Sequence, residues 1–247
     1  MRKCKNILIG IIIFLVLVLV FIVIFKNRIN IGSSVTKNKE EVEALVSINQ
    51  AELSAFVFAT QESPTDHRLH VNFTPSLSIS IKDKVIKEFY IENFESNGNL
   101  GEGVLIHPTE LSVDTVGRTF LFTEPEELMM SEDIVSEGNS IAYTVVPEVT
   151  MYNQVLNKGT ITPYFGIILK DVASVNYQDI LERDGVFEGS KYLEYSGIDI
   201  ADLDTKIQFD IRILFEDGDR YVKRFKGTLS GETLQTEITP VITLQVE

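Results

Sequence analysis

The chain of 247 residues is poor in the residue types that carry most recognisable chemistry: it has no tryptophan, one cysteine and three histidines. The cysteine is Cys4, so the rest of the chain holds no disulfide, no thiolate metal site and no thiol nucleophile. A glycine-rich phosphate loop and a Gly-x-Ser-x-Gly nucleophile elbow are also absent from the sequence. These absences exclude cysteine catalysis, P-loop nucleotide binding and the usual α/β-hydrolase mechanism.

The three histidines do not form a recognisable metal site. His67 and His70 are three residues apart, and His107 precedes a proline. Residues three apart on a strand point to opposite faces, so the first two cannot share a ligand as a pair. We expect isolated surface or loop histidines, and the sequence assigns no catalytic, cofactor-binding or metal-binding residue.

Basic residues are scarce beyond the N-terminus. After Arg28 there are 17 basic and 36 acidic residues, which gives this part of the chain a net charge of −19. Such a chain lacks the basic patch that nucleic acids require, and an anionic membrane surface repels it. We therefore expect no nucleic-acid partner.

Residues 7–25 form a run of 19 residues that are apolar apart from Gly10. As a helix this run reaches ~28 Å, close to the thickness of the hydrocarbon core of a bilayer. A cleaved secretory signal is the alternative, but Lys26, Asn27 and Arg28 follow the run instead of a small-residue cleavage site. The pattern favours a retained transmembrane helix.

The short basic N-terminus indicates the orientation of this helix. Arg2, Lys3 and Lys5 precede the span, and Lys26 and Arg28 follow it, so the charge count itself is nearly balanced. A short basic segment before a long apolar run usually stays in the cytoplasm. We predict a single-pass protein of the cell membrane with its C-terminal domain outside; the reverse topology is the alternative.

The remaining chain divides into a tether and a folded domain. We assign residues 1–26 to the cytoplasmic tip and the transmembrane helix, 27–50 to a tether or short stalk helix, and 51–247 to a β-sandwich domain. Two tandem sandwiches with a break near 124–140 are the alternative.

The apolar pattern beyond residue 51 has the period of two that is typical of strands. It predicts hairpins over 77–91, with a turn at Asp83-Lys84, and over 207–225, where Asp217-Gly218 suits a type I′ turn. Further strands are expected at 104–106, 119–122, 141–146, 164–175 and 241–246, and short helices at 123–130 and 177–183. Many short strands with few helices predict a mainly β fold, an antiparallel sandwich of immunoglobulin-like or jelly-roll-like type.

The layout of an anchor followed by a β-rich domain resembles that of sortase transpeptidases. Thr233-Leu234-Gln235-Thr236 matches the start of their catalytic Thr-Leu-x-Thr-Cys motif, but Glu237 stands at the position of the essential cysteine. A carboxylate cannot replace the attacking thiolate, so sortase activity is excluded.

Clusters of carboxylates and tyrosines remain as weaker candidates. One acidic group, expected to be a solvated loop, comprises Glu124, Glu126, Glu127, Glu132, Asp133 and Glu137; a second comprises Asp199, Asp202, Asp204 and Asp210. The second lacks the spacing and the glycine of a calcium loop, and Asp199 is expected to cap a short helical turn. The tyrosines that could form a sugar platform are Tyr164, Tyr177, Tyr192 and Tyr195, which we interpret as half-buried sheet residues.

These patterns predict a non-enzymatic domain, tethered to the lipid bilayer through residues 7–25, that binds another envelope or surface protein or organises a surface complex. An anchored carbohydrate-binding module or a carboxylate-dependent hydrolase is the alternative.

Overall fold

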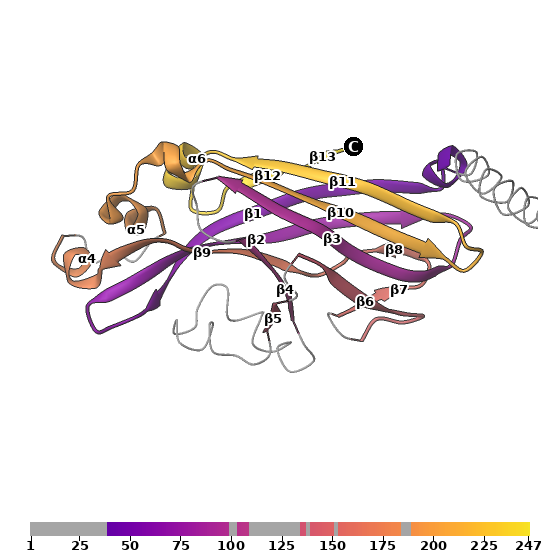
Figure 1. The fold of residues 1–247 in the computed structure, drawn as a ribbon, viewed down its shortest axis with the longest axis horizontal. Coiled ribbons are helices and arrows are strands. Elements are labelled where there is room, and N and C mark those ends of the chain that lie inside the picture. Colours follow the sequence, from indigo (N-terminus) through magenta and orange to yellow (C-terminus); the bar gives the residue numbers. More distant parts are fainter. Residues whose placement is uncertain (1–38, 99–102, 109–133, 137–138, 151–152, 184–188) are drawn as a thin grey trace, which may run out of the picture. The chain divides into compact units, whose positions relative to one another are not determined.

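The computed structural model describes residues 39–98, 103–108, 134–136, 139–150, 153–183 and 189–247 (Figure 1). The predicted span 7–25, the strand 119–122, the helix 123–130 and the first acidic group lie outside these residues. Within them, no helix has the length and apolar character needed to cross a membrane.

The chain divides into two compact units, Met1–Ala44 and Leu45–Glu247. In the first, residues 39–43 form a short helix, and the ammonium of Lys39 lies 3.9 Å from the carboxylate of Glu43 one turn later. The second unit begins with a strand at Val46, inside the range 27–50 that was predicted to be a tether or short stalk helix. Residues 46–50 therefore belong to a strand, because Val46 and Ile48 pair with Ile81 and Ile79 of a neighbouring strand.

The second unit is mainly β, with a few short helices, as predicted. Its strands are β1 (Val46–Gln61), β2 (Asp66–Ile81), β3 (Ile86–Gly98), β4 (Gly103–Pro108), β5 (Ile134–Ser136), β6 (Ile141–Val146), β7 (Gln154–Leu156), β8 (Gly159–Ile161), β9 (Gly166–Asn176), β10 (Thr205–Phe215), β11 (Arg220–Leu229), β12 (Val241–Thr243) and β13 (Gln245–Val246). Its helices are α4 (Tyr177–Arg183), α5 (Gly189–Ser196), the 3-10 helix η2 (Ile200–Leu203) and α6 (Gly231–Thr236).

The strands form two sheets in which almost all pairings are antiparallel, again as predicted. The larger sheet has the order β12-β1-β2-β9-β4-β5, with β8 also paired to β2, and the smaller one has the order β13-β11-β10-β3-β6-β7. The exception among the described pairs is β6 with β7, which run parallel.

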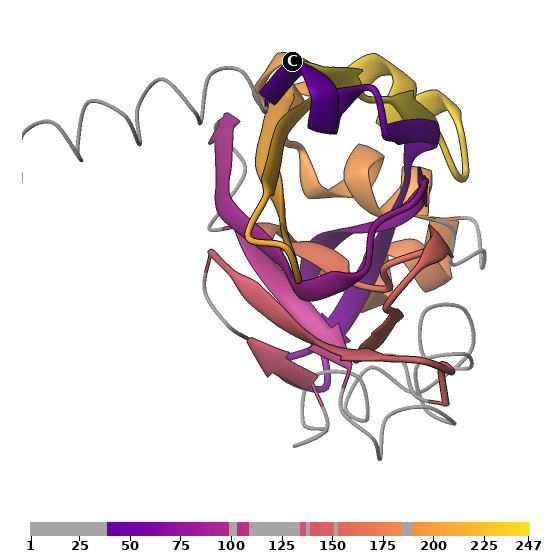
Figure 2. The same cartoon turned by 90° about the vertical axis from the view of Figure 1, so that its right-hand side faces the viewer.

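Two short connections join the sheets at their edges. β12 pairs with β1 and β13 with β11, and only Leu244 separates these two short strands. On the other side β7 pairs with β6 and β8 with β2, with two residues between them. Through these two connections the sheets enclose a common interior, here called the ring, and Figure 2 looks along it.

The interior of this ring is an apolar core with a group of phenylalanines near its middle. The Phe209 ring of the smaller sheet stacks on Phe225 at 5.3 Å and meets the edge of Phe165, which directly precedes β9 of the larger sheet, at 5.5 Å. All three side chains are almost completely buried. Because full burial of such a side chain contributes about 2–3 kcal/mol, these contacts between the sheets stabilise the ring closure.

The predicted hairpin over 77–91 is wrong. β2 and β3 are both strands, but β2 belongs to the larger sheet and β3 pairs with β10 and β6 in the smaller one. The segment between them is a corner, where Asp83 adopts φ = 56° and the ammonium of Lys84 binds both Asp217 and Asp219 of the β10–β11 turn. Burial by itself lowers the pKa of Lys84, but these hydrogen bonds outweigh it and raise the pKa above its ordinary value.

The hairpin over 207–225 is confirmed, but its turn is not type I′. The Gly218 amide donates to the Phe215 carbonyl at 3.0 Å, and only Gly218 of the turn has a positive φ, of 91°. This is a type I turn closed by a glycine bulge. The predicted strand 241–246 is split into β12 and β13, because the chain passes from one sheet to the other at Leu244.

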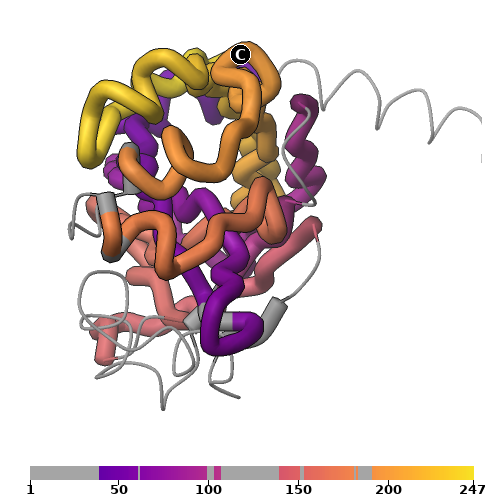
Figure 3. The backbone as a smooth tube through the Cα atoms, turned by 90° about the vertical axis from the view of Figure 1, so that its left-hand side faces the viewer, coloured from indigo at the N-terminus to yellow at the C-terminus, as the bar shows by residue number. Residues whose placement is uncertain are grey.

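Short helices gather at one end of the ring, shown at the front of Figure 3 in orange and yellow. The helix predicted at 177–183 is confirmed as α4, and Asp199 caps η2 as expected by accepting the Ala201 amide at 3.0 Å. Residues 233–236, where the sortase-like motif falls, form part of α6. Leu193, Leu203 and Leu234 of these helices are buried, so they cover this end of the core.

Candidate functional site

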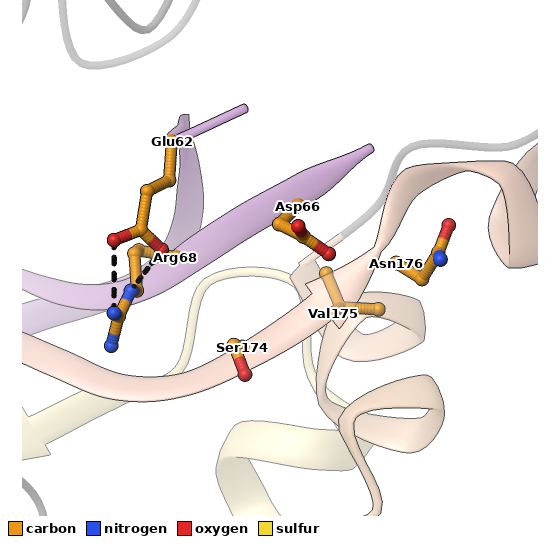
Figure 4. A pocket seen from close by; sticks show the side chains of 6 residues that line it. All are labelled: Glu62, Asp66, Arg68, Ser174, Val175 and Asn176. Carbon is orange, nitrogen blue, oxygen red and sulfur yellow. Dashed lines mark hydrogen bonds and ion pairs between the residues drawn. The ribbon is translucent and has the colours of Figure 1, made fainter. Parts of the chain in front are cut away.

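A shallow pocket of about 220 Å³ lies at the end of the second unit where β1 turns into β2 (Figure 4). Three of its residues come from the β1–β2 segment and three from the end of β9: Glu62, Asp66, Arg68, Ser174, Val175 and Asn176. Five of the six are polar, so the pocket suits polar groups of a partner rather than an apolar ligand.

Sheet register brings the two halves of the pocket together. Asp66 pairs with Asn176 and Arg68 with Ser174, so these side chains lie on the same face of the larger sheet. At the turn, Ser63 donates to the Asp66 carboxylate at 2.9 Å. Opposite, the side chain of Asn176 accepts the Gln178 amide at 2.9 Å and so caps α4.

Arg68 donates two hydrogen bonds to the Glu62 carboxylate, of 2.6 and 2.9 Å, along the β1–β2 side of the pocket (Figure 4). The pair lowers the pKa of Glu62 and raises that of Arg68. A general acid in a glycosidase needs a raised carboxyl pKa, so Glu62 is shifted in the wrong direction for that role. The rim of the pocket is therefore held by hydrogen bonds and an ion pair within the fold, which involve Glu62, Asp66, Arg68 and Asn176.

Two histidines beside this pocket are buried, contrary to the expectation of surface or loop positions. His67 is 7% exposed and His70 only 1%. Residues 69–73 of β2 are all buried, so both faces of the strand are covered there. The alternation of apolar and polar residues along a single strand cannot reveal this. The third histidine, His107, lies in β4, and its side chain is outside the described residues.

The two buried rings have different surroundings. His67 packs against Tyr177, with ring centroids 4.7 Å apart, and its Nδ1 has no hydrogen-bond partner among the described residues. His70 stacks on Phe58 at 5.1 Å and uses both ring nitrogens, one with Thr60 and one with the Asp171 amide. Burial lowers the pKa of both histidines, so both stay neutral at physiological pH.

The second acidic group does not assemble around a cation. Asp204 accepts the Gly231 amide at 2.8 Å, whereas Asp210 lies in β10 and binds Arg224 and Asn93. Across the described part of the chain, no group of three or more histidine, cysteine, aspartate or glutamate residues is placed to hold a metal ion. The two aspartates serve structural contacts instead.

The tyrosines do not form an open platform. Tyr177 packs on His67, and burial, followed by the nearby Tyr177, raises the pKa of Tyr192 to about 12. The backbone carbonyl of Tyr164 accepts the buried Tyr143 hydroxyl at 2.7 Å. All four candidate tyrosines are half-buried, as expected, but Tyr177 lies in α4 and Tyr192 and Tyr195 lie in α5 rather than in a sheet.

Sequence reasoning missed the pocket because its two halves are more than 100 residues apart. The run Glu62-Ser63-Pro64-Thr65-Asp66 does carry a turn signal that could have ended β1 and begun β2. No protein-family model matches the chain, and searches of curated proteins and of solved structures find no match. The geometry of the pocket is thus the main guide to function.

Proposed function

We propose that the chain is a single-pass membrane protein whose second unit lies outside the membrane and binds another envelope or surface protein through the end that carries the pocket. The domain is a β-sandwich in this proposal, tethered by residues 27–44 to the apolar helix 7–25. Its role is recognition rather than catalysis.

The course of β1 supports this assignment of the two ends. The second unit starts at Leu45, and β1 then runs for 16 residues to the turn beside the pocket. At ~3.3 Å per residue this strand is about 50 Å long. A domain tethered through Leu45 therefore carries its pocket at the end most distant from its attachment point.

The chemistry of the pocket rim supports protein recognition. Arg68 and Glu62 are partly exposed, at 43% and 52% of their side-chain surface, and present opposite charges side by side. Polar and charged rims of this kind set the orientation and specificity of protein interfaces.

Orientation in the membrane can be measured with single cysteines. Thr65, at the exposed turn, is replaced by cysteine in a Cys4→Ser background, and intact cells are treated with a membrane-impermeant maleimide. We expect labelling of the T65C variant and no labelling of the native chain, in which Cys4 is cytoplasmic. The opposite pattern would show the reverse topology.

Partner binding can be located with a photo-crosslinking residue at Thr65, in the full-length chain in its native membrane. The matched control carries it at Glu216, which is exposed at the opposite end of the β strands. We expect a discrete crosslinked product from position 65, and a yield of that product at least tenfold lower from position 216. Equal yields at both positions would remove the assignment of the binding end.

A further inference from the structure

His70 has a single tautomer that its neighbours define. The Asp171 amide donates to Nδ1 of His70 at 3.2 Å, so Nδ1 carries no proton. The proton of the neutral ring therefore lies on Nε2, which is 2.7 Å from the hydroxyl oxygen of Thr60 and donates to it. With one nitrogen accepting and the other donating, the neutral ring is fully satisfied in a site that is 99% buried.

Asp171 occupies an irregular part of β9. Leu69 pairs with Ala173 and Val71 with Leu169, so His70 alone stands opposite the three residues 170–172. Asp171 has φ = 54°, a left-handed conformation that aspartate and asparagine adopt more readily than other residues with a side chain. The bond from its amide to His70 ties this bulge to β2.

The bulge determines the register of the pocket. Ala173 is the first residue of β9 beyond it, and residues 174–176, which line the pocket, pair with β2 in the register that the bulge sets. A change of conformation at 170–172 therefore moves one wall of the pocket against the other.

We propose that His70 is a proton-dependent latch for this pocket. Neutral His70 accepts the Asp171 amide and holds the bulge; protonation places a second proton on Nδ1, which removes the acceptor and sets two donors against each other. The bulge then rearranges so that the Asp171 carboxylate replaces its amide as the partner of Nδ1, and residues 173–176 shift. The biological role of the latch rests on the proposed function, since it regulates the same site.

The charged groups around His70 agree with such a switch. Arg68 on its own strand and Lys170 on β9 oppose the imidazolium, while Asp171 on β9 favours it; β1 contributes the uncharged Phe58 and Thr60. Burial is the main cause that lowers the pKa of His70 below 6.5, ahead of these charges. A histidine with a lowered folded pKa stabilises the folded state above pH 6.5, and that contribution is lost as the pH falls through the folded pKa.

The latch is tested by NMR of the full-length chain in detergent micelles, with labelled histidine rings and alanine methyl groups. At pH 7.5 we expect the ring nitrogen shifts of His70 to show the Nε2–H tautomer. On acidification the Ala173 methyl signal should shift with the same midpoint as His70, below pH 6.5. The Ala201 methyl, which lies in η2, serves as the reference and should stay unchanged.

Three variants distinguish the latch from an unspecific response of the fold to low pH. In His70→Gln the amide oxygen can still accept the Asp171 amide but does not titrate, so the Ala173 shift should be lost; His67→Gln should retain it. Asp171→Asn tolerates the left-handed conformation and removes the carboxylate, so the midpoint of the His70 titration should fall further.

Two results would overturn the latch: an Nδ1–H tautomer of His70 in the native chain, or an Ala173 methyl signal that stays constant while His70 titrates. Because no partner is present, either result leaves the crosslinking test of the binding end intact.

Discussion

Asp210 illustrates how this protein accommodates a buried charge at the scale of a single residue. The residue is 6% exposed, and its carboxylate accepts two hydrogen bonds from Arg224, of 2.7 and 3.0 Å, and one of 2.9 Å from Asn93. Burial opposes ionisation, but the hydrogen bond from Arg224 outweighs it and lowers the pKa of Asp210. The side chain therefore stays charged and acts as a clamp between β3, β10 and β11.

Replacing Asp210 with Asn should destabilise the fold in a pH-dependent way. Loss of the charge-assisted bonds costs about 2 kcal/mol at pH 7, or a Tm about 4–8 °C lower. Because the folded pKa of Asp210 is lowered, its contribution is complete above pH 3.8 and is lost as the pH falls through the folded pKa. Thermal unfolding from pH 7 to 2.5 should thus show the two proteins converge. Glu95→Gln, at a more exposed site on the same sheet, is the control and should change Tm by less than about 2 °C.

Gly231 is a residue at which the surrounding atoms leave no room for a side chain. A Cβ there would lie 1.9 Å from the Ile200 carbonyl oxygen and 2.8 Å from the Leu203 side chain. We expect Gly231→Ala to cost about 2–3 kcal/mol, because the backbone of η2 must move. In Gly166→Ala the nearest atom is 3.7 Å away, so the steric cost should be small. Equal Tm values for the two variants would contradict this packing.

Local sequence identified single elements better than their partners. The alternating pattern and the Asp217-Gly218 turn predicted the β10–β11 hairpin because both strands are close in sequence. The same reasoning failed for β2 and β3, since a two-residue polar break can join strands of one sheet or of two. Here the corner is held by Lys84, which binds Asp217 and Asp219 in a turn more than 130 residues further along the chain.

The turn of this hairpin gives a prediction at the scale of an element. Gly218 has φ = 91°, which a β-branched side chain resists, so Gly218→Val should lower the free energy of unfolding by about 1–2 kcal/mol. Gly218→Asn should lose about half as much, because asparagine tolerates positive φ. The order of the Tm values, glycine above asparagine above valine, checks the turn assignment.

At the scale of the whole second unit, ring closure depends on the short segment that contains β12 and β13. Leu244 is 5% exposed between them, and its amide donates to the Ala51 carbonyl of β1 at 2.8 Å. On the opposite sheet, a Cβ at Gly227 of β11 would approach the Leu244 side chain to 2.9 Å. Leu244 thus touches both sheets at the corner where they meet.

Truncation of Leu244 should therefore weaken the whole unit. We expect Leu244→Ala to cost about 2–4 kcal/mol in the free energy of unfolding, measured by urea denaturation of the detergent-solubilised chain. Val246 is 39% exposed in β13, so Val246→Ala serves as the matched control and should cost less than about 1 kcal/mol. A Leu244 variant as stable as this control would show that the corner does not hold the sheets together.

The sequence by itself determined the mainly β character, the antiparallel pairing, the β10–β11 hairpin and α4. These depend on side-chain periodicity and turn residues, which act between neighbours in the chain. Only the tertiary structure decided that β3 leaves the sheet of β2, that His67 and His70 are buried, and that Ser174 faces Arg68 across the pocket. Such features depend on which distant strands pair and in what register. That choice follows from the burial of the whole core, and no local pattern encodes it.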